Sequence, residues 1–458
     1  MYMLRFHLAV FLAKCARLAL RCLGRKASHT PGVVALAVCP RFLEVAPKPP
    51  LTICVTGTNG KTTVSNLLAD ALLADGKRVV ENRDGANIAP GCAANLLNSL
   101  SIFGRSRVDA AIFEVDERAS RLILPPLKPD YLVVTGLFRD SLKRNAHPDY
   151  IFSIINTYCP DTTKLILNAD ELCSSLLKPD SQRTYFGIGR LEGDHDAPYQ
   201  LVADHTLCPK CGAPLRYDYL HYHHVGHAHC PDCDFGSFTA DFLAEQVGTA
   251  SGTLAVRHGG EVETYPLISD IIFNIYNEMA VVATLRQLGI SAQRVQEIIG
   301  KLRVPSSRLD SVTVNGVNVV MAMSKGQSCV SSCRTFDMVA NAPGKKSVVL
   351  MMDDYYDRKK SVEYIGWIYD VDYEVLNRDS VVQVVAAGPR CLDHKVRLLL
   401  AGVSEERITC CSDDANCAGS IDTQLADTVY FLYDTSTYDV ACQVREKLMA
   451  MLEKEDKQ

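Results

Sequence analysis

The chain has 458 residues, of which 47% are hydrophobic and 22% charged, and its formal net charge at pH 7 is -5. This length predicts two or three domains whose cores need no disulfide framework. Lys and Arg are spread along an acidic chain, so we expect no nucleic-acid partner, which would require a basic stripe. The 18 cysteines show no disulfide pattern, and we interpret most of them as buried thiols in a reducing cytoplasm.

Residues 1–48 form an N-terminal segment in which basic residues interrupt the apolar stretches. None of these stretches reaches the roughly 20 residues of a membrane span, and no cleavage site follows them. Lys14, Arg17 and Arg21 are spaced to share one face of a helix. Two interpretations stay open: a basic amphipathic helix at the inner face of the cytoplasmic membrane, or a helix packed on the body of the protein.

From residue 49 to 304, short β-branched runs alternate with helical periodicity. The runs that read as strands are 51–55, 110–115, 131–135 and 164–168. Strands that alternate with helices predict an α/β domain with a parallel sheet and right-handed crossovers. Helical patterns at 277–288 and 292–302 close this central domain before Pro305.

The strongest chemical signal lies between the first predicted strand and the helix that follows it. Glycines there let the backbone approach phosphate oxygens, and the N–H groups of a helix N-terminus bind them. Lys61 would reach the β- and γ-phosphates of a nucleotide, and the hydroxyl of Thr62 or Thr63 would bind Mg²⁺. Val55 stands where a general phosphate loop has glycine, so this loop is a variant. The expected nucleotide-binding residues are Gly57, Thr58, Asn59, Gly60, Lys61, Thr62 and Thr63.

Residues 205–238 interrupt the α/β pattern and read as an inserted module rich in Cys and His. Two C-x-x-C pairs at this separation predict a zinc ribbon with four thiolate ligands. Four thiolates leave no position for a catalytic water, so we expect the Zn²⁺ to be structural. The ligands are Cys208, Cys211, Cys230 and Cys233, and Gly212 and Gly236 would suit the tight turns around them. One of the five histidines between 221 and 229 could replace a cysteine as ligand, but we expect them to be solvated loop residues.

A second α/β unit is predicted over residues 305–458. Its strand-like runs are 347–352, 381–387 and 428–433, and its last helix covers 438–452. An unusual stretch at 352–374 is rich in aspartate and aromatic residues and holds the only tryptophan, Trp367.

The sequence Thr-Gly-Thr-Asn-Gly-Lys-Thr-Thr at 56–63 resembles the phosphate loop of the Mur ligase family. The resemblance implies a central ATPase domain followed by a Rossmann-like domain. It also implies ATP-dependent phosphorylation of a carboxylate, after which an amine displaces phosphate. Glu114 corresponds to the family's metal-binding glutamate, and Asn274 and Asn277 match a segment that contacts adenine. Arg308 matches an arginine that reaches the phosphates from the domain junction.

The inserted ribbon and the Trp-Ile-Tyr-Asp string at 367–370 make the chain resemble the MurT type of this family in particular. That resemblance implies amidation of the α-carboxylate of D-glutamate in lipid II, with ammonia from a GatD-like glutaminase partner. Asp370 would complete the partner's Cys–His site in trans, as the carboxylate of a triad does, with Asp353 and Asp357 as rivals. Lys325 matches a family lysine, and 388–393 with Arg397 also resembles the C-terminal domain of this type.

The sequence departs from the family pattern at three places, one of which is several extra residues between Asp357 and Trp367. Gly136 stands where asparagine is usual, ahead of 138–140, and Gly-Gln-Ser-Cys at 326–329 replaces a Lys-Asn-Pro-like stretch. Two other functions stay open: a stand-alone ligase of the folate or cyanophycin type, which needs no glutaminase, and a non-catalytic ATP-binding scaffold.

Overall fold

The computed structural model describes residues 2–83, 86–101, 103–140, 147–303, 309–324, 328–352 and 365–455. The chain divides into two compact units. The first combines Met1–Phe138, His147–Tyr199 and Asp204–Val304, and the second is mainly Pro305–Gln458. The short segments Arg139–Ala146 and Gln200–Ala203 group with the second unit. Both units are α/β structures built on a central sheet, which confirms the predicted fold class.

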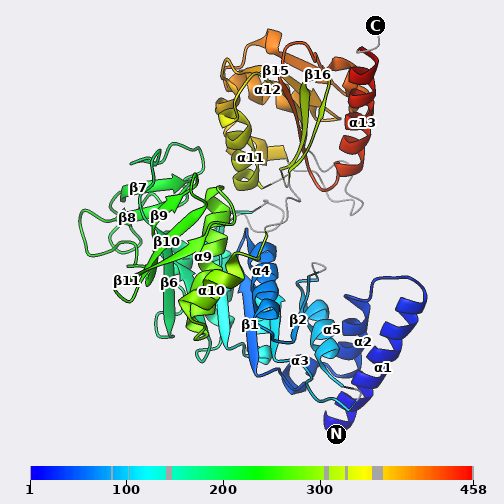
Figure 1. Ribbon diagram of the computed structural model, residues 1–458, viewed down its shortest axis with the longest axis vertical. Coiled ribbons are helices and arrows are strands. Elements are labelled where there is room, and N and C mark those ends of the chain that lie inside the picture. Colours follow the sequence, from blue (N-terminus) through cyan, green and yellow to red (C-terminus); the bar gives the residue numbers. More distant parts are fainter. Residues whose placement is uncertain are drawn as a thin grey trace. The chain divides into compact units, whose positions relative to one another are not determined.

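The first unit is built on a nine-stranded sheet with the order β11-β10-β9-β6-β5-β4-β1-β3-β2 (Figure 1). Strands β1 to β6 and β9 run parallel. Strands β3 and β4 are fully buried, as expected for parallel strands that are covered on both faces. The strands are β1 Leu51–Thr56, β2 Val79–Glu81, β3 Ala110–Glu114, β4 Tyr131–Val134, β5 Lys164–Asn168, β6 Arg183–Ile188, β9 Phe242–Gly248, β10 Thr253–His258 and β11 Glu261–Pro266.

Three strands that follow the inserted module were not predicted. Strand β9 extends the parallel sheet, whereas β10 and β11 fold back antiparallel, so the prediction of a wholly parallel sheet was wrong. Strand β11 lies at the sheet edge and is mostly solvent-accessible, which explains its polar sequence, Glu-Val-Glu-Thr-Tyr-Pro. The hairpin turns at Gly259 and Gly260, both with positive φ. A glycine pair is a recognised hairpin signal that the sequence did contain.

Helices cover both faces of this sheet. The larger core joins α1–α3 and α5–α7 to one face through residues such as Phe113 and Leu132, whereas α4 and α9 pack against each other and on the strands. The helices are α1 Tyr2–Cys22, α2 Thr30–Val38, α3 Phe42–Val45, α4 Lys61–Ala74, α5 Ala89–Ser99, α6 Ser120–Leu127, α7 Pro148–Tyr158, α8 Leu172–Ser175, α9 Ile272–Gln287 and α10 Ala292–Ile299.

Helix α1 packs on the body of the first unit. Phe6, Ala9, Val10 and Ala13 form its buried face and belong to the main core. Lys14 does not point freely into solvent, because its Nζ donates to the carbonyl oxygen of Leu100 at 2.7 Å. Within the described residues, no helix is long and apolar enough to cross a membrane.

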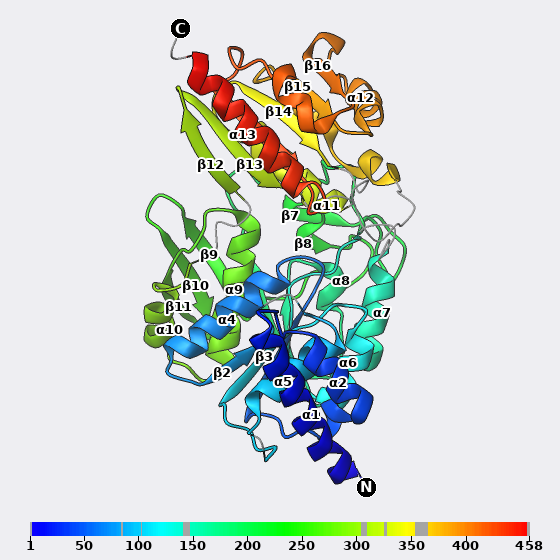
Figure 2. The same cartoon turned by 90° about the vertical axis from the view of Figure 1, so that its right-hand side faces the viewer.

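The second unit holds a six-stranded sheet with the order β12-β13-β17-β14-β15-β16. Helix α13 lies along one face, where its apolar side chains join the core with residues of β13, β14 and β17 (Figure 2). The strands are β12 Leu309–Val314, β13 Val317–Met323, β14 Lys346–Met351, β15 Val381–Ala387, β16 Ile408–Cys411 and β17 Thr428–Tyr433. The helices are α11 Cys329–Asn341, η1 Ile365–Asp370, η2 Tyr373–Leu376, α12 Cys391–Leu400, η3 Glu405–Arg407, η4 Asp414–Ser420 and α13 Tyr438–Glu455.

Candidate functional site

The phosphate loop connects β1 to the N-terminus of α4, as the sequence predicted. Gly57 and Gly60 both have positive φ, 127° and 84°, and a Cβ atom at either position would collide with neighbours. At Gly57 it would meet the Thr135 hydroxyl at 2.3 Å, and at Gly60 the Asn277 Oδ1 at 2.3 Å. Both positions therefore require glycine, because the backbone has a positive φ there and because neighbouring atoms leave no room for a side chain. Gly60 precedes α4 and gives it no side-chain cap, and the first N–H groups of a helix, which have no partner within the helix, are the groups that bind phosphate.

Lys61 is the first residue of α4 and is held at the loop by oxygen atoms. Its Nζ donates to the carbonyl oxygen of Gly57 at 2.5 Å and to Glu117 Oε1 at 3.0 Å. The side chain of Lys61 is 12% exposed and that of Glu117 is 4% exposed. Glu117 was not assigned a role from the sequence, although it lies in the same strand-end segment as Glu114. It positions the Lys61 ammonium group beside the loop.

Thr62 and Glu114 meet near the carboxyl ends of β1 and β3. The Thr62 hydroxyl donates to Glu114 Oε2 at 2.7 Å, and Asn87 Nδ2 donates to Glu114 Oε1 at 3.0 Å. Asn82 fixes the backbone of Glu114, accepting from its N–H and donating to its carbonyl oxygen, each at 2.8 Å. Of the two threonines that the sequence left open, the structure brings Thr62 to the carboxylate.

The two asparagines of α9 lie near the same loop. Asn277 approaches Gly60 closely, and its Nδ2 donates to Asn274 Oδ1 at 3.4 Å. Asn274 Nδ2 in turn donates to the hydroxyl of Ser269 at 3.2 Å. The packing of α9 on α4 brings Asn277 to the loop from a distant part of the sequence, with Asn274 beside it. Arg308, the remaining residue predicted to contact the nucleotide, lies outside the described residues.

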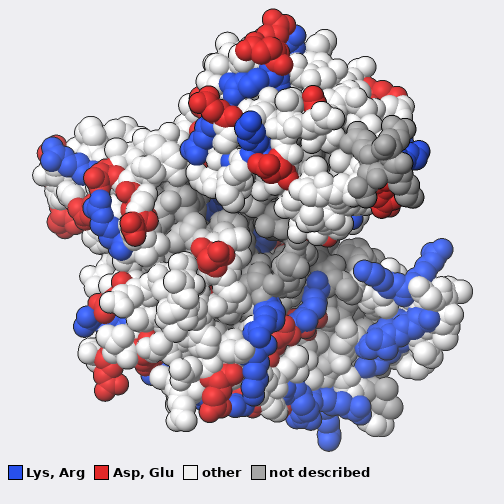
Figure 3. Space-filling model, turned by 45° about the horizontal axis from the view of Figure 1, so that its top comes forward, with Lys and Arg blue, Asp and Glu red and all other residues white. Residues whose placement is uncertain are grey.

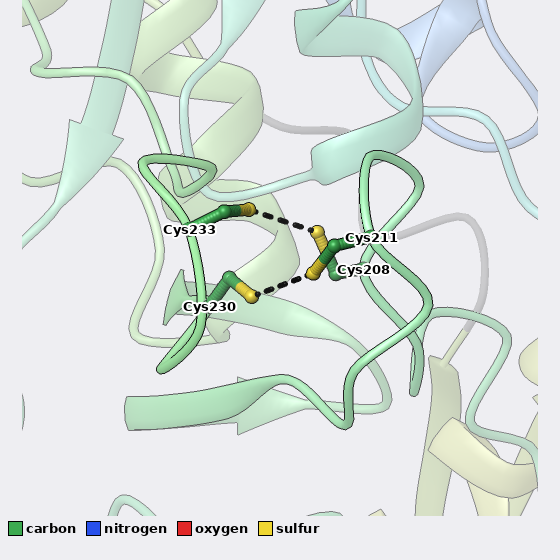
Figure 4. Close-up of side chains that lie close together, drawn as sticks. All are labelled: Cys208, Cys211, Cys230 and Cys233. Carbon is green, nitrogen blue, oxygen red and sulfur yellow. Dashed lines mark hydrogen bonds between the residues drawn. The ribbon is translucent and has the colours of Figure 1, made fainter.

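The four ribbon cysteines converge, as their spacing predicted (Figure 4). The Cys208 and Cys233 sulfurs are 3.5 Å apart, and those of Cys211 and Cys230 are 3.4 Å apart. They flank a hairpin of β7 Arg216–Tyr222 and β8 Val225–His229. Gly212 makes its turn with a φ of 77°. Gly236 does not have a positive φ. A Cβ atom there would lie 3.0 Å from the carbonyl oxygen of Ala228, so the close approach of the backbone explains why this residue is glycine.

The prediction that all five hairpin histidines are solvated was wrong. His227 and His229 are partly exposed and pair with Asp218. His221 is buried, and its Nδ1 lies 2.8 Å from Asp194 Oδ1. His223 and His224 are also buried. The hairpin packs its turn into the first unit, a tertiary effect that the local composition does not reveal.

Asp370 ends the short helix η1 in the second unit. Its side chain is 39% exposed, and its Oδ2 lies 3.7 Å from Arg139 Nη1. The buried Arg397 fixes this segment by donating to the carbonyl oxygens of Ile368 and Val371. Trp367 is buried. The segment is therefore anchored, while the side-chain carboxylate of Asp370 reaches solvent. The rival residues Asp353 and Asp357, and Lys325, lie outside the described residues.

Comparison with known families identifies the class. The Mur ligase middle domain matches residues 55–190, which include the phosphate loop, Glu114 and Glu117. The MurT ligase C-terminal domain matches residues 329–438, which include Asp370 and Arg397. Together with the phosphate loop, these matches define an ATP-dependent ligase.

Individual relatives make the assignment narrower. The chain is 28% identical over 397 residues to the MurT subunit of the glutamine-hydrolysing lipid II isoglutaminyl synthase of Staphylococcus aureus (strain COL), covering 86% of this chain and 88% of that protein. The corresponding subunit of Streptococcus pneumoniae (strain ATCC BAA-255 / R6) is 26% identical over 451 residues, 97% of each chain. A pseudomurein peptide ligase type C from Methanothermus fervidus shares the fold, with a TM-score of 0.65 and 18% identity over 88% of this chain and 79% of that one. The chain belongs to the Mur ligase family and is of its MurT type.

Proposed function

We propose that the chain uses ATP to amidate the α-carboxylate of D-glutamate in the lipid II stem peptide, which leaves D-isoglutamine. The observation that carries this proposal is the convergence of Lys61, Thr62 and Glu114 at the end of β1 and β3. The relatives named as lipid II isoglutaminyl synthase subunits match along 86% and 97% of the chain, which supports the same substrate here.

The residues at the phosphate loop fit ATP and Mg²⁺. The Thr62 hydroxyl and the Glu114 carboxylate, 2.7 Å apart, are the hard oxygen ligands that Mg²⁺ prefers. Mg²⁺ would neutralise charge on the transferring phosphoryl group. Lys61 would add its positive charge from the loop, and the N–H groups of α4 would hold phosphate oxygens in place. Asn274 and Asn277 would contact the adenine.

The reaction that we propose has two steps. A carboxylate oxygen of D-glutamate attacks the γ-phosphorus of ATP, and the bond to ADP breaks, giving an acyl phosphate and ADP. Ammonia then attacks the acyl carbon, loses a proton, and expels inorganic phosphate with cleavage of the carbon–oxygen bond. The protein contributes mainly position and fixed positive charge, as in other phosphoryl transfers.

The four cysteines fit a structural Zn²⁺. In a tetrahedral site with Zn–S bonds of about 2.3 Å, the sulfurs lie about 3.8 Å apart, close to the observed 3.4 and 3.5 Å. Burial raises the pKa of Cys208, but backbone N–H donors of Cys211 and Lys210 outweigh it and lower this pKa to about 7. The ribbon would hold its hairpin in shape and take no part in the chemistry.

We further propose a GatD-like glutaminase as the partner that supplies ammonia. Asp370 supports this, because it is a solvent-accessible carboxylate on a segment that Arg397 and Trp367 anchor. Such a carboxylate would orient the partner's catalytic histidine and stabilise its cationic form.

Helix α1 supports peripheral contact with the inner face of the cell membrane. Leu4, Leu8 and Phe11 are exposed on the side opposite its packed face. Figure 3 shows Lys and Arg side chains gathered over the N-terminal helices, at the right of the view. Apolar and basic groups together favour an anionic lipid surface. The chain should sediment with vesicles of anionic phospholipid, and equal sedimentation of a Leu8→Ser, Phe11→Ser variant would exclude this role for α1.

The direct test incubates the purified chain with ATP, ammonium and lipid II, followed by mass analysis of the stem peptide. The proposal predicts the small mass decrease of a carboxyl group that becomes an amide. A stand-alone ligase would instead join an amino acid and increase the mass. A scaffold would neither change lipid II nor turn over ATP with any acceptor.

A further inference from the structure

A second group of metal-binding side chains lies in the first unit, apart from the four ribbon cysteines. It consists of Glu171, His205 and His224, whose ligand atoms all lie within 4.8 Å of one another. Glu171 Oε1 is 3.7 Å from His224 Nε2 and 3.9 Å from His205 Nε2. The two imidazole rings meet edge to face, with centroids 4.7 Å apart.

Three distant parts of the chain contribute these residues. Glu171 caps the N-terminus of α8 just after β5. His205 precedes the first cysteine pair, and His224 lies in the turn between β7 and β8. The cluster therefore connects the inserted module to the carboxyl end of β5 in the central sheet. No sequence motif predicts this cluster, because its three residues are far apart along the chain.

Three of the imidazole nitrogens in this cluster make no hydrogen bond among the described residues. His205 Nε2 and both ring nitrogens of His224 are buried without a hydrogen bond. The His224 side chain is 1% exposed and that of Glu171 is not exposed, whereas His205 is 20% exposed. Buried ring nitrogens without partners are unfavourable in an apolar interior. A bound cation would satisfy the Nε2 atom of each ring.

The carboxylate of Glu171 is oriented as metal ligands commonly are. It accepts backbone N–H groups of Cys173 at 2.7 Å, Ser174 at 2.9 Å and Leu137 at 2.9 Å. A carboxylate has about four lone-pair sites, so at least one remains for a further ligand. Hydrogen bonds of this kind fix the orientation of a carboxylate ligand and keep it ionised.

We propose that Glu171, His205 and His224 bind one divalent transition-metal ion of the zinc class, at a site separate from the ribbon. Two imidazoles and one carboxylate are typical ligands of such ions. Donor atoms that share one ion lie about 3 to 3.5 Å apart. The donor atoms of this cluster lie within 4.8 Å of one another, so they need to close by up to about 1.5 Å. Water can supply the fourth ligand on the accessible side of His205.

The ion would fix the inserted hairpin beside the phosphate loop. Glu171 Oε2 accepts the N–H of Leu137, and the N–H of the next residue, Phe138, donates to the Thr58 hydroxyl at 2.9 Å. The Phe138 ring also packs against His224, with centroids 4.7 Å apart. The metal ligands and the loop are thus connected through two consecutive residues after β4.

The test measures metal content of the full chain after saturation with Zn²⁺ and removal of excess metal. The wild type should hold two ions per chain, and His224→Asn and Glu171→Gln should each hold one. His227→Asn is the matched control, because His227 is exposed on the same hairpin and should keep both ions. One ion in the wild type, or two in both cluster variants, would overturn the proposal.

Cobalt substitution separates the two sites even where a variant folds poorly. Co²⁺ bound by thiolates gives an intense charge-transfer band, whereas Co²⁺ bound by nitrogen and oxygen gives only weak visible bands. In the wild type we expect both signals, and in His205→Asn only the thiolate signal. If the wild type gives the thiolate signal alone, the cluster is a paired carboxylate and imidazole without metal. Both outcomes are read from metal binding, so they do not depend on the proposed amidation.

Discussion

At the scale of single residues, Lys61 and Glu114 are positioned by neighbours that the motif does not contain. Glu117 pairs with Lys61, and Asn87 and Asn82 hold Glu114. The motif predicted which residue types would meet at the loop, because glycine, lysine and threonine at this fixed spacing are typical of a phosphate-binding loop. It could not predict Glu117, since a glutamate three residues after Glu114 has no distinctive pattern.

Replacement of Lys61 by alanine removes the positive charge that faces the phosphates. Lys61→Ala should lower the rate of ATP turnover about a hundredfold or more, as loss of one transition-state contact commonly does, with the fold unchanged by circular dichroism. Lys77→Ala is the control, since Lys77 lies beyond the end of α4 and pairs with Asp75 at the surface. A normal rate in Lys61→Ala would refute the assignment of the phosphate loop.

The role proposed for Asp370 predicts a split between two nitrogen sources. With the glutaminase partner present, Asp370→Asn should lose activity with glutamine and keep activity with free ammonium. Asp379→Asn, an exposed acidic residue of the same unit, should keep both. If Asp370→Asn keeps full activity with glutamine, another residue completes the partner's site.

His394 makes the stability of the second unit depend on pH. Burial lowers the pKa of His394 to about 4 from its ordinary value of 6.5, and Tyr373 lies in hydrogen-bond contact at 2.6 Å. The unfolded chain therefore takes up a proton as the pH falls below 6.5, while the folded chain resists until about 4. Stability is fully present above 6.5 and is lost between these values.

Trp367, the only tryptophan, lies in the second unit and reports its unfolding by fluorescence. The urea midpoint of the wild type should fall as the pH is lowered from 6.5 to 4. His394→Gln cannot titrate in this range, so its midpoint should change much less. Equal pH dependence in both proteins would show that other groups are responsible.

At the scale of elements, the alternating pattern predicted the strands that are buried along most of their length. Strands β1, β3, β4, β14, β15 and β17 appear where short apolar runs occur. The edge strand β11 and its neighbour β10 escaped this method, because both carry polar residues on accessible positions and show no continuous apolar run. The burial of His221 and His224 escaped it too, since their environment comes from segments remote in sequence.

The ribbon is an element whose stability should depend on its metal. Cys208→Ser should release one Zn²⁺ per chain and lower the thermal stability of the first unit, because metal binding contributes folding free energy. Cys411→Ser, outside the cluster, should keep the metal content of the wild type. Unchanged metal in Cys208→Ser would refute the ribbon assignment.

At the scale of the whole molecule, two α/β units were predicted from hydrophobic periodicity and from Pro305. The periodicity could not show that 139–140 and 200–203 group with the second unit, because these segments are short and interrupt the first unit in sequence. It also could not show that α1–α3 share the main core. Both features arise from long-range packing, for which a single sequence gives no local signal.

The central claim is that this chain amidates a carboxylate through an acyl phosphate. It is tested most directly with lipid II whose D-glutamate α-carboxylate carries heavy-isotope oxygen, incubated with the chain, ATP and ammonium. We predict that one labelled oxygen appears in inorganic phosphate for each amide formed. Amide formation without label in the phosphate, or ATP hydrolysis without amide, would contradict the account.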